Sequence, residues 1–184
     1  MEIGILALQG SVSEHHVIFR KCGVAFHDVR LPKDLNGING LVMPGGESTT
    51  LRKLLKNSGL WKELEKGTIP ILGTCAGAVL LGNCDDDTLG LVNINILRNA
   101  YGRQIDSFES EITLETDEFD GIAKFPGVFI RAPQIENVFG NCKVIAHLEN
   151  EIVGVKQGKH MALTFHPELT DDCLLHEKWI SELE

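Results

Sequence analysis

The chain has 184 residues, of which 43% are hydrophobic and 23% are charged. These proportions are ordinary for a globular protein with a sizeable core, and they exclude a largely disordered chain and a collagen-like repeat. At this length we expect a single domain over residues 1–184. No run approaches the roughly 18 uninterrupted apolar residues of a membrane-spanning helix, so no membrane partner is expected.

The net charge of −9 comes from two acidic stretches. Residues 109–120 hold six acidic and no basic side chains, and residues 168–184 hold six acidic side chains and one basic side chain. We expect both stretches to be solvated surface. The phosphates of a nucleic acid would be repelled by such a chain, and no basic patch offsets this, so no nucleic-acid partner is expected.

The cysteines are odd in number and far apart in the sequence. Neither a disulfide scaffold nor a Cys-rich zinc site is therefore expected, and we predict no metal and no cofactor. The N-terminus has no basic region and no cleavage site of a signal peptide, which together with reduced cysteines predicts a cytoplasmic location. The five residues are Cys22, Cys75, Cys84, Cys142 and Cys173.

In the first half of the chain, short apolar runs alternate with amphipathic segments. Residues 3–8 form the first expected strand, buried on both faces. Ser11 and Glu14 have the spacing of a capping box for a helix that ends near Gly23. This alternation predicts a parallel sheet with helices on both faces. The other expected strands of this half cover residues 24–29, 40–43 and 69–72, and helices are expected from about 49 and from about 78.

The second half of the chain contains closely spaced strand patterns separated by short turns with Gly or Asn, which predict hairpins. From about Thr170 a last helix is expected, with Leu175, Trp179 and Leu183 on one face. The predicted fold is therefore α/β, with three layers: an open, mostly parallel sheet, helices on both faces and an antiparallel extension. The expected strands cover residues 91–97, 111–114, 128–131, 143–147, 152–156 and 161–165.

Gly73-Thr74-Cys75-Ala76-Gly77 lies between an expected strand and an expected helix. This is the pattern of a nucleophile elbow with cysteine in place of serine. The glycines permit a tight turn, and the positive end of the helix dipole favours the thiolate of Cys75. The alternative interpretation is a tight turn with an inert, buried cysteine.

Phe165-His166-Pro167-Glu168 follows the last expected strand. A histidine at the carboxyl end of a strand lies where open α/β sheets build their sites, although a lone histidine is often structural. Glu168 could accept the second imidazole N–H of His166 and fix its tautomer. Cys75, His166 and Glu168 thus form a plausible nucleophile, base and orienting acid.

Pro44-Gly45-Gly46-Glu47-Ser48-Thr49 also follows an expected strand, and Ser48 or Thr49 could cap the next helix. Bare N–H groups at Gly45 or Gly46 could bind an oxyanion together with the N–H of Ala76. The alternative is a plain turn and helix cap. Because all three motifs lie at strand ends, together they indicate thiol-based acyl transfer.

With these motifs the sequence resembles the class I, triad-type glutamine amidotransferases. Gly73–Gly77 matches their nucleophile motif, and His166 with Glu168 matches their His-x-Glu pair. More narrowly, the sequence resembles the glutaminase subunits of pyridoxal 5′-phosphate synthases. The narrower resemblance rests on Leu8-Gln9-Gly10, Pro44 to Thr50, Arg98-Asn99, Gly102-Arg103-Gln104, Asp106 to Glu109, Phe129 to Pro133 and Phe165 to Thr170.

The resemblance implies hydrolysis of L-glutamine to L-glutamate and ammonia through a thioester. Cys75 would attack the side-chain amide, His166 would move the proton, and Glu168 would orient His166. Gly45 or Gly46 with Ala76 would form the oxyanion hole. The implied glutamine-binding residues are Gly46, Glu47, Ser48, Arg98, Ile130 and Arg131.

The resemblance also implies a partner. A separate (β/α)8-barrel synthase subunit would receive the ammonia and make pyridoxal 5′-phosphate, the coenzyme form of vitamin B6. In such pairs the glutaminase is weak until the synthase binds. We expect Gln9, the turn after the first strand and the loop Pro44–Thr50 to be the parts that this partner reorganises.

Two other interpretations remain open at this point. One is a different hydrolase on a similar sheet, such as a Cys peptidase or a chaperone-like relative. The other is a binding module that has lost its activity. The pair Arg98 and Arg131 favours a small amino-acid amide over a peptide, because guanidinium groups suit an α-carboxylate. The intact Cys75, His166 and Glu168 favour an active enzyme.

Overall fold

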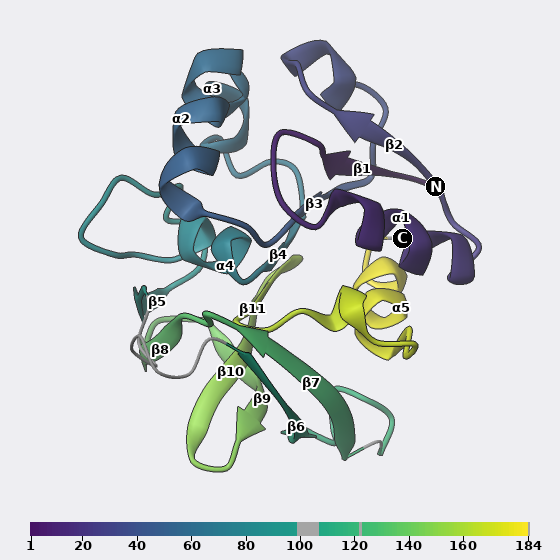
Figure 1. Ribbon diagram of the computed structural model, residues 1–184, viewed down its shortest axis with the longest axis vertical. Coiled ribbons are helices and arrows are strands. Elements are labelled where there is room, and N and C mark those ends of the chain that lie inside the picture. The colour runs from purple at the N-terminus through teal and green to yellow at the C-terminus, as the bar shows by residue number, and fades with distance from the viewer. Residues whose placement is uncertain (99–106, 122, 184) are drawn as a thin grey trace.

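The computed structural model describes residues 1–98, 107–121 and 123–183. Its main feature is one nine-stranded sheet (Figure 1). The strands are β1 (Glu2–Leu6), β2 (Ala25–Val29), β3 (Gly40–Met43), β4 (Ile71–Thr74), β6 (Ser107–Leu114), β7 (Lys124–Ile130), β9 (Lys143–Leu148), β10 (Glu151–Gln157) and β11 (His160–Leu163). Across the sheet their order is β2-β1-β3-β4-β11-β10-β9-β6-β7.

The sheet has a parallel half and an antiparallel half. Strands β2, β1, β3, β4 and β11 run parallel to one another. From β11 onward, β10, β9, β6 and β7 pair antiparallel. The predicted α/β fold with an antiparallel extension is confirmed, and the carboxyl ends of the parallel strands share one edge where loops can meet.

Helices cover both faces of the sheet (Figure 1). Helices α1 and α5 contribute to one hydrophobic core, and α2, α3 and α4 contribute to the other, together with a separate hairpin-like pair of strands, β5 and β8. The bounds are α1 (Val12–Lys21), α2 (Ser48–Ser58), α3 (Leu60–Leu64), α4 (Ala76–Leu81), α5 (Leu174–Ser181), β5 (Ile94–Leu97), β8 (Gln134–Val138) and the short 3-10 helices η1 (Pro32–Leu35) and η2 (Pro167–Leu169).

Side-chain alternation along the strands divides the two cores. In β3, Val42 packs on the α1–α5 side, whereas Leu41 and Met43 pack on the α2–α4 side. In β10, Val153 and Val155 are two residues apart and yet lie in different cores. The pairing of β10 with β9 shifts register between these residues, and such an irregularity reverses the face that the following side chains occupy.

The antiparallel strands differ most from the sequence-based prediction. β6 and β7 begin several residues earlier than expected, and β8 was not predicted. The first half of β6 is largely polar, which hides the strand pattern. β7 contains Pro126, which is tolerated because β7 is an edge strand that does not need every N–H for pairing. The last helix begins at Leu174 rather than near Thr170, and its predicted apolar stripe is buried.

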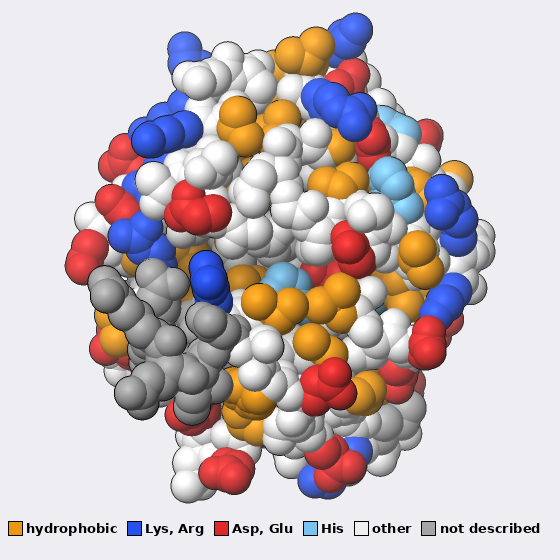
Figure 2. Space-filling model, in the orientation of Figure 1, with side chains coloured by type: hydrophobic (Ala, Val, Ile, Leu, Met, Phe, Trp, Pro, Cys, Tyr) orange, Lys and Arg blue, Asp and Glu red, His pale blue; other side chains and the backbone are white. Residues whose placement is uncertain are grey.

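Surface and helix properties agree with a globular chain. On the face that Figure 2 shows, acidic and basic side chains are interspersed rather than gathered by sign. Within residues 1–98, 107–121 and 123–183, no helix combines the length and the hydropathy that crossing a bilayer requires.

Candidate active site

Cys75 occupies a strained turn between β4 and α4. Its backbone has φ 48° and ψ −103°, a conformation that residues other than glycine rarely adopt. A Cβ atom at Gly73 would lie 2.7 Å from the carbonyl carbon of Gly77, and one at Gly77 would lie 2.0 Å from the carbonyl oxygen of Met43. The glycines on both sides therefore permit the tight turn, as the elbow pattern predicts.

His166 approaches Cys75 from the loop that follows β11. The backbone N–H of His166 donates to the carbonyl oxygen of Val128 at 2.8 Å, which ties this loop to β7. A Cβ atom at Gly45 would lie 2.3 Å from Cε1 of His166 and 3.1 Å from Cβ of Cys75. The thiol-bearing residue and the imidazole thus meet beside the bare backbone of Gly45.

Glu168 completes the arrangement from η2. Its Oε1 lies 2.7 Å from Nδ1 of His166, and both side chains are almost fully buried. This contact leaves Nε2 of His166 for the side of Cys75 and the pocket. The structure therefore brings together all three residues that the sequence predicts as nucleophile, base and orienting acid.

The pKa values of this pair are shifted in opposite directions. Burial acts to lower the pKa of His166, but the neighbouring Cys75 and Glu168 outweigh burial and raise it. Burial acts to raise the pKa of Glu168, but the imidazoles of His15 and His166 and the hydroxyl of Ser11 hold it below its ordinary value. Both shifts favour an imidazolium paired with a carboxylate.

Ser11 is a functional residue that the sequence reasoning misassigned. The prediction of a capping box is wrong, because Ser11 makes no side-chain cap and instead donates to Oε1 of Glu168 at 2.6 Å. The predicted partner, Glu14, accepts from the hydroxyl of Ser13. A buried carboxylate needs a donor more than the start of α1 does, since water can reach exposed helix-end N–H groups.

His15 and Thr74 form a second layer behind the acid. Nε2 of His15 lies 3.6 Å from Oε1 of Glu168 and 3.5 Å from Oγ1 of Thr74. Burial lowers the pKa of His15, whereas its charged form would stabilise the Glu168 carboxylate from this distance; Ser11 and His166 bond to the carboxylate directly. The sequence signal that could have indicated these residues is Thr74, a polar residue at the end of a fully buried strand.

Thr74 also changes the prediction for the oxyanion hole. The N–H of Gly45 donates to Oγ1 of Thr74 at 3.1 Å, so Gly45 is not a free donor in this conformation. This corrects the expectation that Gly45 could serve. The N–H groups of Gly46 and Ala76 make no hydrogen bond within the part of the chain that the structure describes. They are the remaining predicted donors.

A pocket of about 570 Å³ opens beside Cys75. Every predicted catalytic, oxyanion and glutamine-binding residue except Glu168 lines it, and Glu168 lies behind His166. The pocket is lined by Gln9, Gly10, Ser11, Gly45, Gly46, Glu47, Ser48, Cys75, Ala76, Val79, Arg98, Ile130, Arg131, Pro133 and His166.

Glu47 reaches the pocket but has a second, structural role. Its carboxylate accepts from the N–H groups of Thr49 at 2.9 Å and Thr50 at 2.7 Å and so caps α2. The expectation that Ser48 or Thr49 is the cap is wrong, since the longer Glu47 side chain satisfies two N–H groups at once. These hydrogen bonds outweigh partial burial and lower the pKa of Glu47 to about 2.

Arg98, Arg131 and Ile130 also line the pocket. Arg98 pairs with Asp86 at 2.7 Å and donates to Oγ1 of Thr49 at 3.0 Å, which fixes its guanidinium near the start of α2. Ile130 presents its carbonyl oxygen 3.7 Å from Sγ of Cys75, and Arg131 follows with φ 44°. Some residues of the motifs that follow Arg98 lie outside the described residues. They are Asn99, Gly102, Arg103, Gln104 and Asp106.

Comparison with known proteins places this chain in a family. Residues 5–184 match the model of the SNO glutamine amidotransferase family. The chain therefore belongs to the SNO glutamine amidotransferase family. This result confirms the resemblance that the Cys75 and His166 motifs indicate.

Two curated relatives illustrate the similarity. Subunit PdxT of the pyridoxal 5′-phosphate synthase of Methanocaldococcus jannaschii is 49% identical over 94% of this chain and 92% of its own length. Subunit PdxT of the same synthase of Thermus thermophilus is 41% identical over 97% of this chain and 95% of its own length.

Solved structures give the same fold. A crystal structure titled glutamine amidotransferase is 38% identical, covers 98% of both chains and superposes with a TM-score of 0.91. The PurLQS structure from Thermotoga maritima is 18% identical over 99% of this chain and 96% of its own, with a TM-score of 0.71. At that identity the likeness concerns the fold alone.

Replacing Ser11 with Ala should slow glutamine hydrolysis by about 10- to 100-fold, mainly in kcat, because a hydrogen bond to a charged group contributes roughly 1.5–3 kcal/mol. Ser13→Ala is the matched control, since Ser13 lies two residues away on the exposed surface. Steady-state kinetics of both variants test this. Equal rates for Ser11→Ala and Ser13→Ala would contradict a role for Ser11 in holding Glu168.

The stability that Glu168 contributes should depend on pH. Its lowered pKa means that this contribution is present above about 4.5 and is lost as the pH falls further, and the raised pKa of His166 means that it declines as the pH rises above about 6.5. Urea unfolding of the wild type and Glu168→Gln should therefore differ most between these values, by about 1.5–3 kcal/mol. A difference that stays constant from acid to alkaline pH would be inconsistent with the pair.

Proposed function

We propose that this chain is the glutaminase subunit of a pyridoxal 5′-phosphate synthase and hydrolyses L-glutamine to L-glutamate and ammonia. One observation carries the proposal: Cys75, His166 and Glu168 lie together beside one pocket in a member of the SNO family. Relatives named as PdxT subunits at 41–49% identity over nearly the whole chain support the assignment to this synthase.

The chemistry follows from the positions of the three residues. His166 accepts the thiol proton of Cys75, and the sulfur attacks the side-chain carbonyl carbon of glutamine. The imidazolium then donates a proton to the departing nitrogen, so ammonia leaves and a thioester remains. Water, deprotonated by His166, hydrolyses the thioester to glutamate and the free thiol. Glu168 keeps Nδ1 of His166 protonated and stabilises the imidazolium.

The oxyanion of each tetrahedral intermediate would be bound by the N–H groups of Gly46 and Ala76. Ala76 begins α4 directly after the nucleophile, where the N–H of the following residue usually serves this purpose. Gly46 lies on the loop after β3 and packs against the side chain of Gln9. Two preorganised donors in such a site lower the barrier more than they would in water.

Glutamine itself would be held by the rest of the pocket wall. Arg98, fixed by Asp86 and Thr49, can pair with the α-carboxylate. Ile130 and Arg131 can contribute backbone groups, since Ile130 already points its carbonyl oxygen toward Cys75. Ser48 lines the same pocket. The carboxylate of Glu47 is engaged by α2, its N–H by Gln9 and its carbonyl oxygen by Leu51, so a contact of Glu47 with substrate would require one of these hydrogen bonds to rearrange.

The proposed partner is a (β/α)8-barrel synthase subunit in the cytoplasm. Free ammonia would be mostly protonated at neutral pH and lost to water, so a direct handover is chemically sensible. Three hydrogen bonds hold the loop after β3 beside the site, and a partner could rearrange them. The N–H of Gly45 is bound to Thr74 and the carbonyl oxygen of Gly45 to the N–H of Ser11, while Gln9 accepts from the N–H of Glu47.

Glutamate release from glutamine should be low for this chain alone and should rise when the synthase subunit is added. Cys75→Ala, measured in both conditions, should abolish release, because the thioester cannot form. An enzyme-coupled glutamate assay provides the measurement. If no glutamate forms while the two proteins demonstrably bind, the chain is a silent scaffold and the proposal fails.

The same experiment separates the other two interpretations. A peptidase would cleave members of a peptide library and leave glutamine intact. A glutamine-mimic diazo-ketone should alkylate Cys75 in an active glutaminase, and mass spectrometry locates the adduct. Absence of an adduct with the synthase present would favour a non-catalytic binding module.

Binding of the synthase should slow amide hydrogen exchange in the loop Pro44–Thr50 and in the turn that contains Gln9. These segments line the mouth of the pocket and are tied to each other by single hydrogen bonds, which a partner can rearrange. Hydrogen–deuterium exchange with mass spectrometry compares the free and bound chains, with α3 as an internal reference. Unchanged exchange in both segments would show that the partner activates the site by another route.

A further inference from the structure

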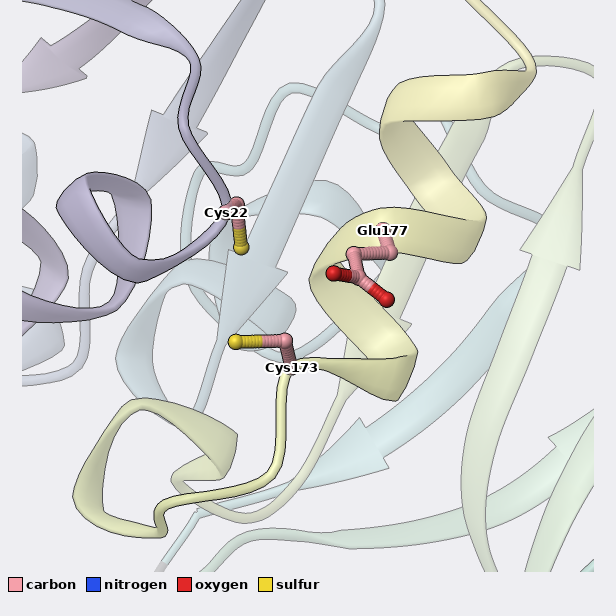
Figure 3. A group of neighbouring side chains, drawn as sticks. All are labelled: Cys22, Cys173 and Glu177. Carbon is pink, nitrogen blue, oxygen red and sulfur yellow. The ribbon is translucent and has the colours of Figure 1, made fainter.

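Two cysteines and a glutamate from opposite ends of the chain converge on the surface between α1 and α5. Figure 3 shows the sulfur atoms of Cys22 and Cys173 facing each other, with the carboxylate of Glu177 beside them. One ligand atom of each residue lies within 4.8 Å of the others. Both cysteines are half-buried and free, and Glu177 is exposed.

Regular secondary structure holds these three side chains in place. Cys22 directly follows the last residue of α1, and its N–H donates to the carbonyl oxygen of Ile18 at 2.9 Å. Cys173 precedes the first residue of α5, and the N–H of Glu177 donates to its carbonyl oxygen at 2.9 Å. Cys173 and Glu177 are therefore one helical turn apart on the same face, a spacing that lets two side chains bind one ion.

We propose that Cys22, Cys173 and Glu177 form a zinc site that joins α1 to α5. Zinc binds thiolate sulfur at about 2.3 Å and carboxylate oxygen at about 2.0–2.2 Å, and a tetrahedral ion requires ligand atoms roughly 3.5–3.8 Å apart. The three ligand atoms lie within 4.8 Å of one another, so they would draw together on binding the ion. A water molecule would supply the fourth ligand.

The donor set and its surroundings favour this metal. Two sulfur ligands select zinc over calcium or magnesium, which prefer oxygen alone. Burial and the neighbouring Cys173 raise the pKa of Cys22 to about 12, so zinc would bind by displacing the thiol proton. The basic side chains adjacent in sequence, Lys21 and Lys178, are paired with Asp171 and Glu182. Asp172 is also engaged, since it caps α5 through the N–H of Leu174 at 2.9 Å.

The proposed site lies apart from the catalytic pocket. None of its three residues lines the pocket, and the glutaminase mechanism uses none of them. Its location nevertheless connects the two segments that hold the catalytic acid, since α1 follows Ser11 and α5 follows η2, which carries Glu168. Zinc should therefore stabilise the α1–α5 side of the molecule without being required for chemistry at Cys75.

The test uses the full chain with Cys75→Ala as the starting protein, so that the active-site thiol cannot bind metal. Zinc chloride is added to this protein together with a chromophoric chelator that competes for the metal. A phosphine reductant keeps the thiols reduced. We expect one zinc per chain and a thermal midpoint raised by about 5 °C or more at a hundredfold excess over Kd. Cobalt chloride should give an ultraviolet thiolate-to-cobalt charge-transfer band, which reports sulfur ligation directly.

Adding Cys22→Ser or Cys173→Ser should weaken zinc binding at least about tenfold and lower the intensity of the cobalt band, because one of the two sulfur ligands is lost. Adding Cys142→Ser is the matched control, because Cys142 is also half-buried but packs against the other core. Adding Glu177→Gln, which leaves both thiols and the packing in place, should weaken zinc binding while retaining the cobalt band.

Zinc affinity that is unchanged by Cys22→Ser, Cys173→Ser and Glu177→Gln would overturn the proposal, since binding would then occur elsewhere on the protein. Absence of a cobalt band in the starting protein would overturn it as well. If a serine variant fails to fold by circular dichroism, Glu177→Gln and the cobalt spectrum of the starting protein still decide the question.

Discussion

The active site depends on how closely three backbone turns approach one another at the carboxyl ends of the parallel strands. A Cβ atom at Gly10 would lie 1.7 Å from the carbonyl oxygen of Gly45, and one at Gly77 would lie 2.0 Å from that of Met43. These contacts involve backbone atoms, so a side-chain rotation cannot relieve them. Because the turns pack without side chains between them, Cys75 and His166 can meet above Gly45.

This close packing carries an electrostatic cost that the surrounding residues offset. Glu168 is an ionised carboxylate with almost no exposure to water, and burial of such a group is unfavourable unless donors surround it. One of its oxygens receives both Ser11 and His166, at 2.6 and 2.7 Å. The start of α1 therefore gives up a side-chain cap, and the acid gains a partner. The hydroxyl of Ser11 thus helps to hold Glu168, which orients His166, rather than stabilising the start of α1.

Much of this arrangement could be predicted from the sequence, because the catalytic residues lie in motifs that determine their own local geometry. The elbow at Cys75 needs its flanking glycines, and the His-x-Glu pair places both groups after one strand. What could not be predicted is where a polar side chain has several competing partners. Ser11 has the pattern of a cap and serves Glu168, whereas Glu47 has the pattern of a ligand and caps α2. Only the tertiary structure determines which partner is closer.

The cluster of Cys22, Cys173 and Glu177 could not be predicted from the sequence for the same reason: its residues meet only in the tertiary structure. Spacing rules detect metal ligands that lie on one short segment, and two of these three residues satisfy such a rule only once α5 is known to begin at Leu174. The third comes from α1, which lies beside α5 because both helices cover the same face of the sheet. Since these two segments also hold Glu168, an ion bound there would act on the acid side of the triad. Cys75, on the opposite side of His166, is held by the elbow between β4 and α4 and would be unaffected.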